Sequence, residues 1–303
     1  MAEVTRKRTG ELLHHAFDLL TKNPDGLPGR DVIAYVASKV TLSQYEAGAY
    51  DAGGRRFDTI IRYATVDCVK AGWMVKQHGK WSVTDEGLKA HQTLQDPEAF
   101  YKRAVQLYAE WKKGTEAKSD DDAPAAAPTP TGVGVGASNT ATITFEQAEE
   151  TAWADIERHL GKMLPYEFQD LVAALLRAMG YHVGWVAPPG KDGGVDILAY
   201  NDPLGTRPPR MKVQVKRQQA KVTVDGLRAF LAVVGADEVG VFVNLGGFTE
   251  DAKAEARAQH GKRVTLIDIE RLVDLWAEHY DRLDESGRRR LPLQSIYFLA
   301  PEP

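Results

Sequence analysis

The sequence predicts an α/β domain with a mixed central sheet, preceded by a mainly helical domain. Three observations lead to this fold class. From about residue 144 onwards, helix-like and strand-like patterns alternate, as they do in α/β domains. The run VGVFV at 239–243 is apolar throughout, which is typical of a strand buried on both faces. Before about residue 112, by contrast, apolar side chains recur at the spacing of helices.

The N-terminal domain is expected to span residues 1–112 and to contain three helices followed by a hairpin. Two Trp-containing runs, WMV at 73–75 and WSV at 81–83, flank a glycine-containing turn and predict the hairpin. This order of elements resembles a winged-helix domain. Apolar stripes predict its helices near 12–20, at about 30–40, at about 55–71 and, as a closing helix, at about 97–112.

The third helix and the hairpin are rich in basic residues, which suit contacts with DNA phosphates and grooves. Two other interpretations stay open: a solvated charged face, and a surface that pairs with another protein. The DNA contacts of this domain are expected to come from Arg55, Arg56, Arg62, Lys76 and Lys80.

A segment rich in Asp, Ala, Pro and Gly occupies residues 113–143 and predicts a flexible linker, because it holds few large apolar side chains. The second domain is expected over 144–283, followed by a C-terminal tail at 284–303. Its helices are expected at about 144–162, 165–179, 223–234, 249–259 and 270–282. Its strands are expected at about 181–187, 195–200, 211–218, 239–244 and 263–269.

Two short apolar strands of the second domain carry polar residues that together suit phosphodiester hydrolysis. Asp196 lies in the first strand, and Gln214 and Lys216 lie in the next. Because strand side chains alternate with period two, Gln214 and Lys216 share one face. If the strands pair, a carboxylate, an amide oxygen and an ammonium meet there, and a divalent cation bound among them would activate a water molecule. A structural salt bridge at Asp196 and an ordinary surface lysine at 216 are the alternatives.

Further motifs stand in a fixed order around these residues: PYEFQDL at 165–171, MGY at 179–181, KDGGVD at 191–196, QVKR at 214–217 and GGFT at 246–249. In this order and spacing they resemble the Mrr-type restriction endonucleases of the PD-(D/E)xK-like nuclease superfamily, over about 140 residues. The N-terminal domain resembles the winged-helix domain that accompanies many of these enzymes. The resemblance implies a restriction-endonuclease-like mixed sheet flanked by helices.

The same resemblance assigns the catalytic roles to Asp196, Gln214 and Lys216. It implies a divalent cation, expected to be Mg²⁺ with Mn²⁺ able to substitute. Carboxylate, amide and carbonyl oxygens are the ligands that Mg²⁺ prefers. The cation would therefore be held by Asp196, Gln214 and the backbone carbonyl of Val215.

Two further residues are candidates for contacts in the second domain. Where the family often has Phe-Glu in an early helix, this chain has Phe168-Gln169, so the preceding Glu167 is the candidate for an additional metal ligand. Acidic residues are also common near helix N-termini, which is the alternative explanation for Glu167. Arg217 belongs to a basic stretch that is expected to attract DNA.

The resemblance implies a metal-dependent DNA endonuclease that is directed to modified, methylated foreign DNA in restriction. Its partner would be double-stranded DNA, and a homodimer is compatible with the sequence. One alternative is a repair or recombination nuclease that acts on branched or damaged DNA. The other is a DNA-binding regulator without catalytic activity.

The composition limits other functions. The 303 residues carry a net charge of −4, so any DNA contact must come from local basic surface. Cys68 is the single cysteine, which excludes an intramolecular disulfide and a cysteine-rich metal site. No apolar run reaches the roughly 18 residues that span a bilayer, and no apolar signal core follows the first residues. A cytoplasmic protein without membrane contact is therefore expected.

Overall fold

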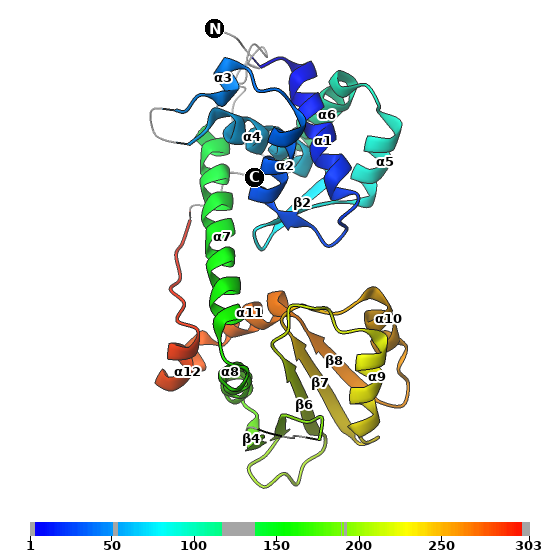
Figure 1. Cartoon of the computed structure of the whole chain (residues 1–303), viewed down its shortest axis with the longest axis vertical. Helices are drawn as coiled ribbons and strands as arrows, with labels where there is room; N and C mark the ends of the chain where they lie inside the picture. Colours follow the sequence, from blue (N-terminus) through cyan, green and yellow to red (C-terminus); the bar gives the residue numbers. More distant parts are fainter. Residues whose placement is uncertain (1–3, 51–53, 117–136, 189, 191–192, 299–303) are drawn as a thin grey trace. The chain divides into compact units, whose positions relative to one another are not determined.

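The computed structural model describes residues 4–50, 54–116, 137–188, 190 and 193–298 (Figure 1). They divide into two compact units. The N-terminal unit comprises Met1–Ala154 together with Tyr297–Pro303, and the C-terminal unit comprises Asp155–Ile296. The division falls inside a single helix, α7 (Ala137–Lys162). No helix among the described residues is long and apolar enough to cross a membrane.

The N-terminal unit is mainly helical, as predicted. It contains a small antiparallel sheet with the strand order β1-β3-β2, in which β2 and β3 form the predicted hairpin. The short helices α3 and α5 and the strand β1 were not predicted. The helices and strands before α7 are α1 (Arg6–Leu20), β1 (Leu27–Pro28), α2 (Gly29–Lys39), α3 (Gln44–Ala47), α4 (Arg56–Lys70), β2 (Met74–Gln77), β3 (Lys80–Val83), α5 (Asp85–Thr93) and α6 (Pro97–Glu116).

Helix α1 lies at the centre of this unit. Its apolar stripe, which includes Leu13 and Phe17, is fully buried and packs against α2, α4 and α6. Gly10 allows the close approach of α6, because a Cβ added there would lie 1.9 Å from the carbonyl oxygen of Pro97. Thr5 begins the helix as its N-cap, accepting a hydrogen bond from the backbone N–H of Arg8.

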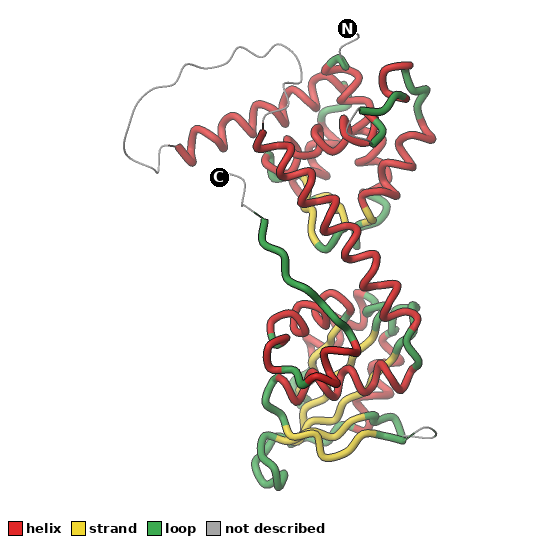
Figure 2. Tube along the Cα trace, turned by 90° about the vertical axis from the view of Figure 1, so that its left-hand side faces the viewer, coloured by secondary structure: helices red, strands yellow, loops and turns green. Residues whose placement is uncertain are grey.

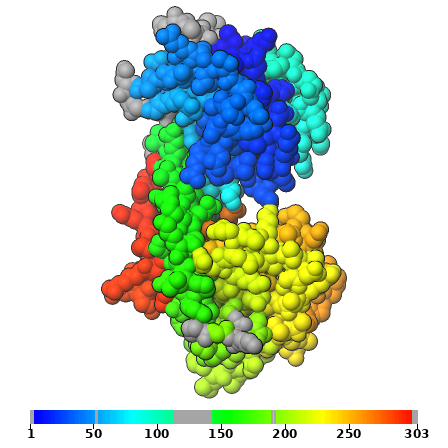
Figure 3. All heavy atoms as spheres, viewed as in Figure 1, coloured from blue at the N-terminus to red at the C-terminus, as the bar shows by residue number. Residues whose placement is uncertain are grey.

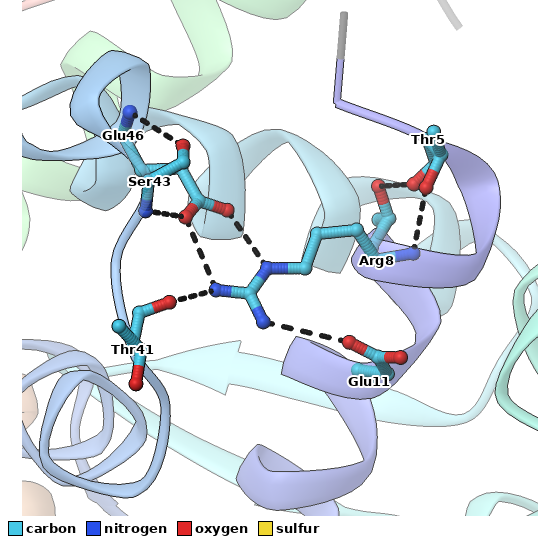
Figure 4. A network of polar contacts seen from close by, with 7 residues as sticks. Thr5, Arg8, Glu11, Thr41, Ser43 and Glu46 are labelled. Atoms are coloured by element: carbon cyan, nitrogen blue, oxygen red, sulfur yellow. Dashed lines mark hydrogen bonds and ion pairs between the residues drawn. The ribbon is translucent and has the colours of Figure 1, made fainter.

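A partly buried polar network joins α1 to α3 (Figure 4). The guanidinium of Arg8 donates to both carboxylate oxygens of Glu46, at 2.9 and 3.1 Å, and to the carbonyl of Thr41 at 2.8 Å. Glu46 also accepts from the backbone N–H of Ser43, which completes a capping box. Burial raises the pKa of Glu46, but the hydrogen bonds from Arg8 and Ser43 outweigh burial and hold the pKa below its usual value.

The partly buried carboxyl of Asp67 on α4 makes the stability of the N-terminal unit depend on pH. Burial raises the pKa of Asp67 to about 6, although the hydroxyl of Tyr101 donates to it at 2.8 Å and lowers it. Because this folded-state pKa lies above the unfolded value, the contribution of the protonated form is complete below about pH 4 and is lost as pH rises through about 6.

We therefore expect Asp67→Asn, which is neutral at every pH, to match the wild type near pH 4 and to be more stable by about 1–3 kcal/mol at pH 8. Asparagine still accepts the Tyr101 hydrogen bond, so the packing is preserved. Urea denaturation of both proteins between pH 4 and 8 measures the difference. A stability difference that does not change with pH would contradict the prediction.

The C-terminal unit is built on a five-stranded mixed sheet with the order β4-β5-β6-β7-β8. The pairs β4–β5 and β5–β6 are antiparallel, whereas the pairs β6–β7 and β7–β8 are parallel. Together with the helical N-terminal unit, this mixed sheet flanked by helices confirms the predicted fold class. The strands, yellow in Figure 2, are β4 (His182–Val186), β5 (Ile197–Tyr200), β6 (Arg210–Lys216), β7 (Glu238–Asn244) and β8 (Arg263–Ile267).

Helices cover both faces of this sheet (Figure 1). On one face, α9 (Val224–Val233) and α10 (Glu250–Ala258) pack on Phe242 and its neighbours. The side chains of Val213 and Ile197 point to the opposite face, where α8 (Pro165–Ala178) contacts β4, β5 and β6. Helix α11 (Ile269–Glu278) follows β8 and packs against it.

The predicted domain boundaries do not coincide with the boundary between the two compact units. The middle of the predicted linker, residues 117–136, lies outside the described residues, and its flanks belong to α6 and α7. Residues 144–154 were assigned to the second domain but pack with the N-terminal unit. The predicted tail begins with a helix, α12 (Glu285–Arg290), that packs on α8. After it, Leu291 is buried and accepts a hydrogen bond from the indole of Trp276 at 3.0 Å.

Candidate active site

The three predicted catalytic residues lie at one end of the sheet. Asp196 immediately precedes β5, and Gln214 and Lys216 lie at the carboxyl end of β6. The two strands are antiparallel with Ile197 opposite Val213, and the carboxylate of Asp196 accepts a hydrogen bond from the N–H of Val215, the residue between Gln214 and Lys216. Strand alternation places Gln214 and Lys216 on one face of β6. The structure therefore brings the three side chains to the same region.

Hydrogen bonds with β6 fix the position of Asp196, which is 6% exposed. Its backbone N–H donates to the carbonyl of Val213 at 2.8 Å. Its carboxylate Oδ2 accepts from the N–H of Val215 at 2.7 Å, in the place where a backbone carbonyl would continue the ladder. The N–H and C=O of one strand residue point to the same side, so the carbonyl of Val215 also points towards the β5 side of β6. A carboxylate oxygen and a carbonyl oxygen thus face the same space.

Gln214 lies under the loop that leads into β5. A Cβ added at Gly194 would lie 3.9 Å from Nε2 of Gln214. Gly193 and Gly194 have φ values of +63° and +84°, which side chains other than glycine rarely adopt. The two glycines therefore let the chain turn tightly beside the amide of Gln214 before it enters β5.

Lys216 lies above an aromatic side chain of the neighbouring strand. In the parallel pairing of β6 and β7, Gln214 is opposite Phe242 and Lys216 is opposite Asn244. The ammonium of Lys216 is 5.5 Å from the centre of the Phe242 ring, within the range of a cation–π contact. Phe242 is itself fixed against Phe230 and Phe248. This packing supports the side chain of Lys216, which is partly buried.

Gln169 on α8 supports the site, and its role was not predicted from the sequence. Its side-chain amide is buried and donates to the carbonyl of Ala187 at 2.8 Å and to that of Asp196 at 3.4 Å. One amide group therefore connects α8 to the residues that follow β4 and precede β5. The sequence carries a signal for this role, because Gln169 is a polar residue that adjoins Phe168 on the apolar stripe of its helix.

We expect Gln169→Leu to lower the free energy of unfolding by about 1–3 kcal/mol, since two buried carbonyls lose a donor. Cleavage should also decrease, because Asp196 is less firmly held. Gln218→Leu, which changes an exposed amide on the same domain, is the matched control and should have little effect. Chemical denaturation measures the difference, and equal stability of the two variants would contradict the role of Gln169.

The sequence makes Glu167 a candidate metal ligand, but its carboxylate forms a hydrogen bond at the start of α8. Its carboxylate is exposed and accepts from the backbone N–H of Leu164 at 2.9 Å, at the start of α8. The unpaired N–H groups of a helix N-terminus favour such a carboxylate. This capping contact agrees with the alternative explanation for Glu167, and its role as a metal ligand stays a prediction.

Arg217 is turned away from the catalytic face. It follows Lys216 directly, so its side chain leaves the opposite face of the strand. Its guanidinium donates to the carbonyl of Gly161 in the last turn of α7, and its Nε is buried without a partner among the described residues. In this arrangement Arg217 stabilises a helix C-terminus, and the DNA contact predicted for it is not formed by an exposed side chain.

Two of the five basic residues predicted to contact DNA in the N-terminal unit are buried. Arg62 and Lys76 form ion pairs with Glu150 and Glu146 of α7, and their side chains are 7% and 6% exposed. Every residue of α4 lies within the described part of the chain, and none of them is exposed. The prediction that Arg62 and Lys76 face DNA therefore does not hold for this conformation, because α7 covers them.

The other three predicted DNA contacts are only partly buried. Arg55 forms an ion pair with Asp58 at 2.6 Å, and Arg56 stacks on Tyr45 at 4.8 Å from the ring centre. Lys80 begins β3 and is also partly buried. These side chains remain candidates for phosphate contacts.

The donor atoms near Asp196 suit a hard divalent cation. Within the described part of the chain, no three His, Cys, Asp or Glu side chains lie together as a metal site would need. The carboxylate of Asp196, the amide oxygen of Gln214 and the carbonyl of Val215 are nevertheless oxygen ligands at one end of two paired strands. Mg²⁺ commonly binds through one or two carboxylates while keeping several waters, so a set with one carboxylate fits it.

Comparisons with known proteins identify the C-terminal domain. The family model of the restriction endonucleases (Mrr_cat) matches residues 160–276, which include Asp196, Gln214 and Lys216. Among solved structures, the chain is similar to "MspJI Restriction Endonuclease in Complex with 27-mer Oligonucleotide", at 19% identity and a TM-score of 0.30; the match covers 68% of this chain and 48% of that one. No curated protein matches the chain. On the family match, residues 160–276 form a restriction endonuclease domain of the Mrr type.

Proposed function

We propose that this protein is a divalent-metal-dependent DNA endonuclease that cuts modified, methylated DNA in restriction. The observation that carries the proposal is the hydrogen bond that holds the carboxylate of Asp196 on the N–H of Val215, between Gln214 and Lys216, inside a restriction endonuclease domain. A buried carboxylate beside neutral oxygen ligands and an ammonium suits phosphodiester hydrolysis.

In the proposed reaction, Asp196, Gln214 and the carbonyl of Val215 would hold the cation. When bound, it lowers the pKa of a water molecule and neutralises charge on the scissile phosphate. The N–H of Val215 holds the Asp196 carboxylate in place beside Gln214. The ammonium of Lys216 would orient the attacking water and donate to phosphoryl oxygens as negative charge increases on them.

The preference for modified DNA rests on the resemblance of the sequence motifs to Mrr-type enzymes. It is tested by digestion of one plasmid prepared without modification, with 5-methylcytosine and with N6-methyladenine, each with Mg²⁺ or with excess chelator. We expect cleavage of a modified plasmid in Mg²⁺ and none in chelator. Equal cutting of all plasmids would reject the modification dependence.

The same assay separates the two alternative functions. A branched duplex that is cut faster than any modified linear DNA would indicate a repair or recombination nuclease. Binding of every DNA without cleavage, in Mg²⁺ and in Mn²⁺, would indicate a regulator without catalytic activity. The intact set of Asp196, Gln214 and Lys216 favours the nuclease.

A further inference from the structure

An acidic segment of α7 covers part of the basic surface that the sequence predicts to bind DNA. Within the N-terminal unit, Nζ of Lys76 lies 2.8 Å from Oε2 of Glu146, and Nη2 of Arg62 lies 2.6 Å from Oε2 of Glu150. Figure 3 shows this part of α7, in green, against the blue N-terminal residues. All four side chains are nearly buried, so the contact excludes water from both ion pairs.

Backbone donors take part in the same contact. Oε1 of Glu150 accepts from the N–H of Arg30, in the first turn of α2, at 2.5 Å. Glu149 accepts from the N–H of His78, in the turn between β2 and β3, at 3.2 Å. The ring of His78 packs edge-on against Trp153, at 4.6 Å between centres. The carboxylates of one helix segment thus contact α2, α4 and the hairpin together.

These donors are of the kinds that bind DNA phosphates. Proteins hold phosphate oxygens with Arg and Lys side chains, with backbone N–H groups and with helix N-termini. The surface supplies one of each: Arg62, Lys76, the N–H of His78 and the N-terminal turn of α2. Each donor points at a carboxylate oxygen, which resembles a phosphate oxygen in charge and in hydrogen bonding.

The carboxylates of α7 do not pair with every hydrogen-bond donor of this surface. Nε and Nη1 of Arg62 are buried and have no hydrogen-bond partner among the described residues. Burial lowers the pKa of Lys76 below its usual value, although Glu146 beside it raises the pKa. Burial likewise raises the pKa of Glu149. Such ion pairs stabilise a contact weakly, because desolvation offsets most of their attraction.

We propose that the surface formed by Arg30, Arg62, Lys76 and His78, called here the N-terminal basic surface, binds the phosphates of duplex DNA, and that residues 146–153 of α7 occupy it in competition with DNA. The bound segment then lowers the affinity of the free protein for DNA. The DNA partner rests on the proposed function, whereas the competition rests on the contacts of α7.

The first test removes the charge of the segment. In the full chain, Glu146→Gln, Glu149→Gln and Glu150→Gln together should raise the affinity for duplex DNA by about tenfold or more. Release of Arg62 and Lys76 should also steepen the dependence of log K on log[salt] by about 1.8, since each additional phosphate that the protein neutralises adds about 0.9 to the slope. Fluorescence anisotropy with excess chelator measures binding without cleavage.

Two controls show whether the increase in affinity comes from this surface. Glu86→Gln, Glu98→Gln and Glu110→Gln remove the same charge elsewhere in the N-terminal unit and should change affinity by less than about twofold, as remote surface charges are screened. Adding Lys76→Gln to the first triple variant should abolish most of the increase. Equal increases in both triple variants, or an increase that survives Lys76→Gln, would overturn the proposal.

A reversible crosslink tests the competition directly. A Cβ added at Gly79, whose φ is +69°, lies 3.4 Å from Cβ of Trp153, close to the roughly 3.5–4.5 Å found in disulfides. It also lies 2.9 Å from Cα of Glu150, so the backbone must shift slightly to admit the cysteine. In the double variant Gly79→Cys, Trp153→Cys, the oxidised form should bind DNA about tenfold more weakly than the reduced form. The reduced form carries the same substitutions and is the matched control.

Equal affinity of the oxidised and reduced forms would show that the segment does not compete with DNA. The charge variants decide the question independently if the crosslink fails to form. All these measurements report binding, so they separate the competition from catalysis. If the wild type cleaves DNA but the charge variants bind it no more tightly, the competition is rejected and the nuclease function is not. If the variants bind DNA more tightly but no form of the protein cleaves it, the nuclease function is rejected and the competition is not.

Discussion

Asp196→Asn is expected to reduce DNA cleavage by about 10³-fold or more while the protein stays folded. The carboxylate of Asp196 is the only acidic side chain among the proposed ligands, so an amide there would bind a divalent cation far more weakly. The fold should persist because asparagine Oδ1 can still accept the hydrogen bond from the N–H of Val215. The variant therefore separates loss of the metal ligand from loss of structure.

The measurement is a time course of plasmid cleavage at saturating Mg²⁺, together with thermal unfolding of both proteins. Asp225→Asn, which changes an exposed carboxylate in the first turn of α9, is the matched control and should cleave at the wild-type rate. Full activity of Asp196→Asn, or wild-type cleavage in excess chelator, would show that the cation is not held as proposed.

The arrangement of the three candidate residues depends mainly on local geometry. Strand periodicity places Gln214 and Lys216 on one face, and the pairing of β5 with β6 brings Asp196 to the N–H of Val215 between them. The apolar run at 239–243 likewise predicts a buried strand correctly, and this strand is β7. These features depend on period-two alternation and on burial of both sheet faces, and both are visible in the residue order.

The residues that were misplaced depend on contacts between distant parts of the chain. Arg62 and Lys76 are covered by glutamates 88 and 70 residues further along, and no local pattern shows which helix packs over them. Gln169 reaches carbonyls 18 and 27 residues away. Such partners are set by the tertiary fold, so a single sequence presents these residues only as charged or polar positions.

Two other departures carried a local signal. Arg217 follows Lys216 by one position, and strand alternation alone sends it to the opposite face. Glu167 stands three residues after Leu164, the spacing at which a helical side chain reaches back to cap the N-terminus. The helix in the predicted tail also has a capping residue, since Asp284 accepts from the N–H of Gly287 at 2.7 Å. The strand position of Arg217 thus argues against the DNA contact that its basic character suggests, and the position of Glu167 supports the capping role named as its alternative.

Lys216→Met is expected to lower the rate of cleavage by about 10²-fold or more and to change DNA affinity by less than about tenfold. Methionine keeps an unbranched stem to pack on Phe242 but removes the ammonium. The ammonium acts mainly when water attacks and negative charge increases on the phosphoryl oxygens. Ground-state binding of DNA is shared with many other basic residues, so it should be affected much less.

Lys212→Met is the matched control for this prediction, because Lys212 lies on the same strand and the same face, four residues earlier. Its ammonium pairs with Glu238 at 2.8 Å and donates to the carbonyl of Val233, so the control should lower stability and leave the rate of cleavage of the folded protein unchanged. Single-turnover cleavage and anisotropy on the same DNA separate the two effects. If Lys216→Met lost binding and cleavage equally, Lys216 would be a phosphate clamp. Because the chemical step would then lack its ammonium, another group would have to stabilise the transition state.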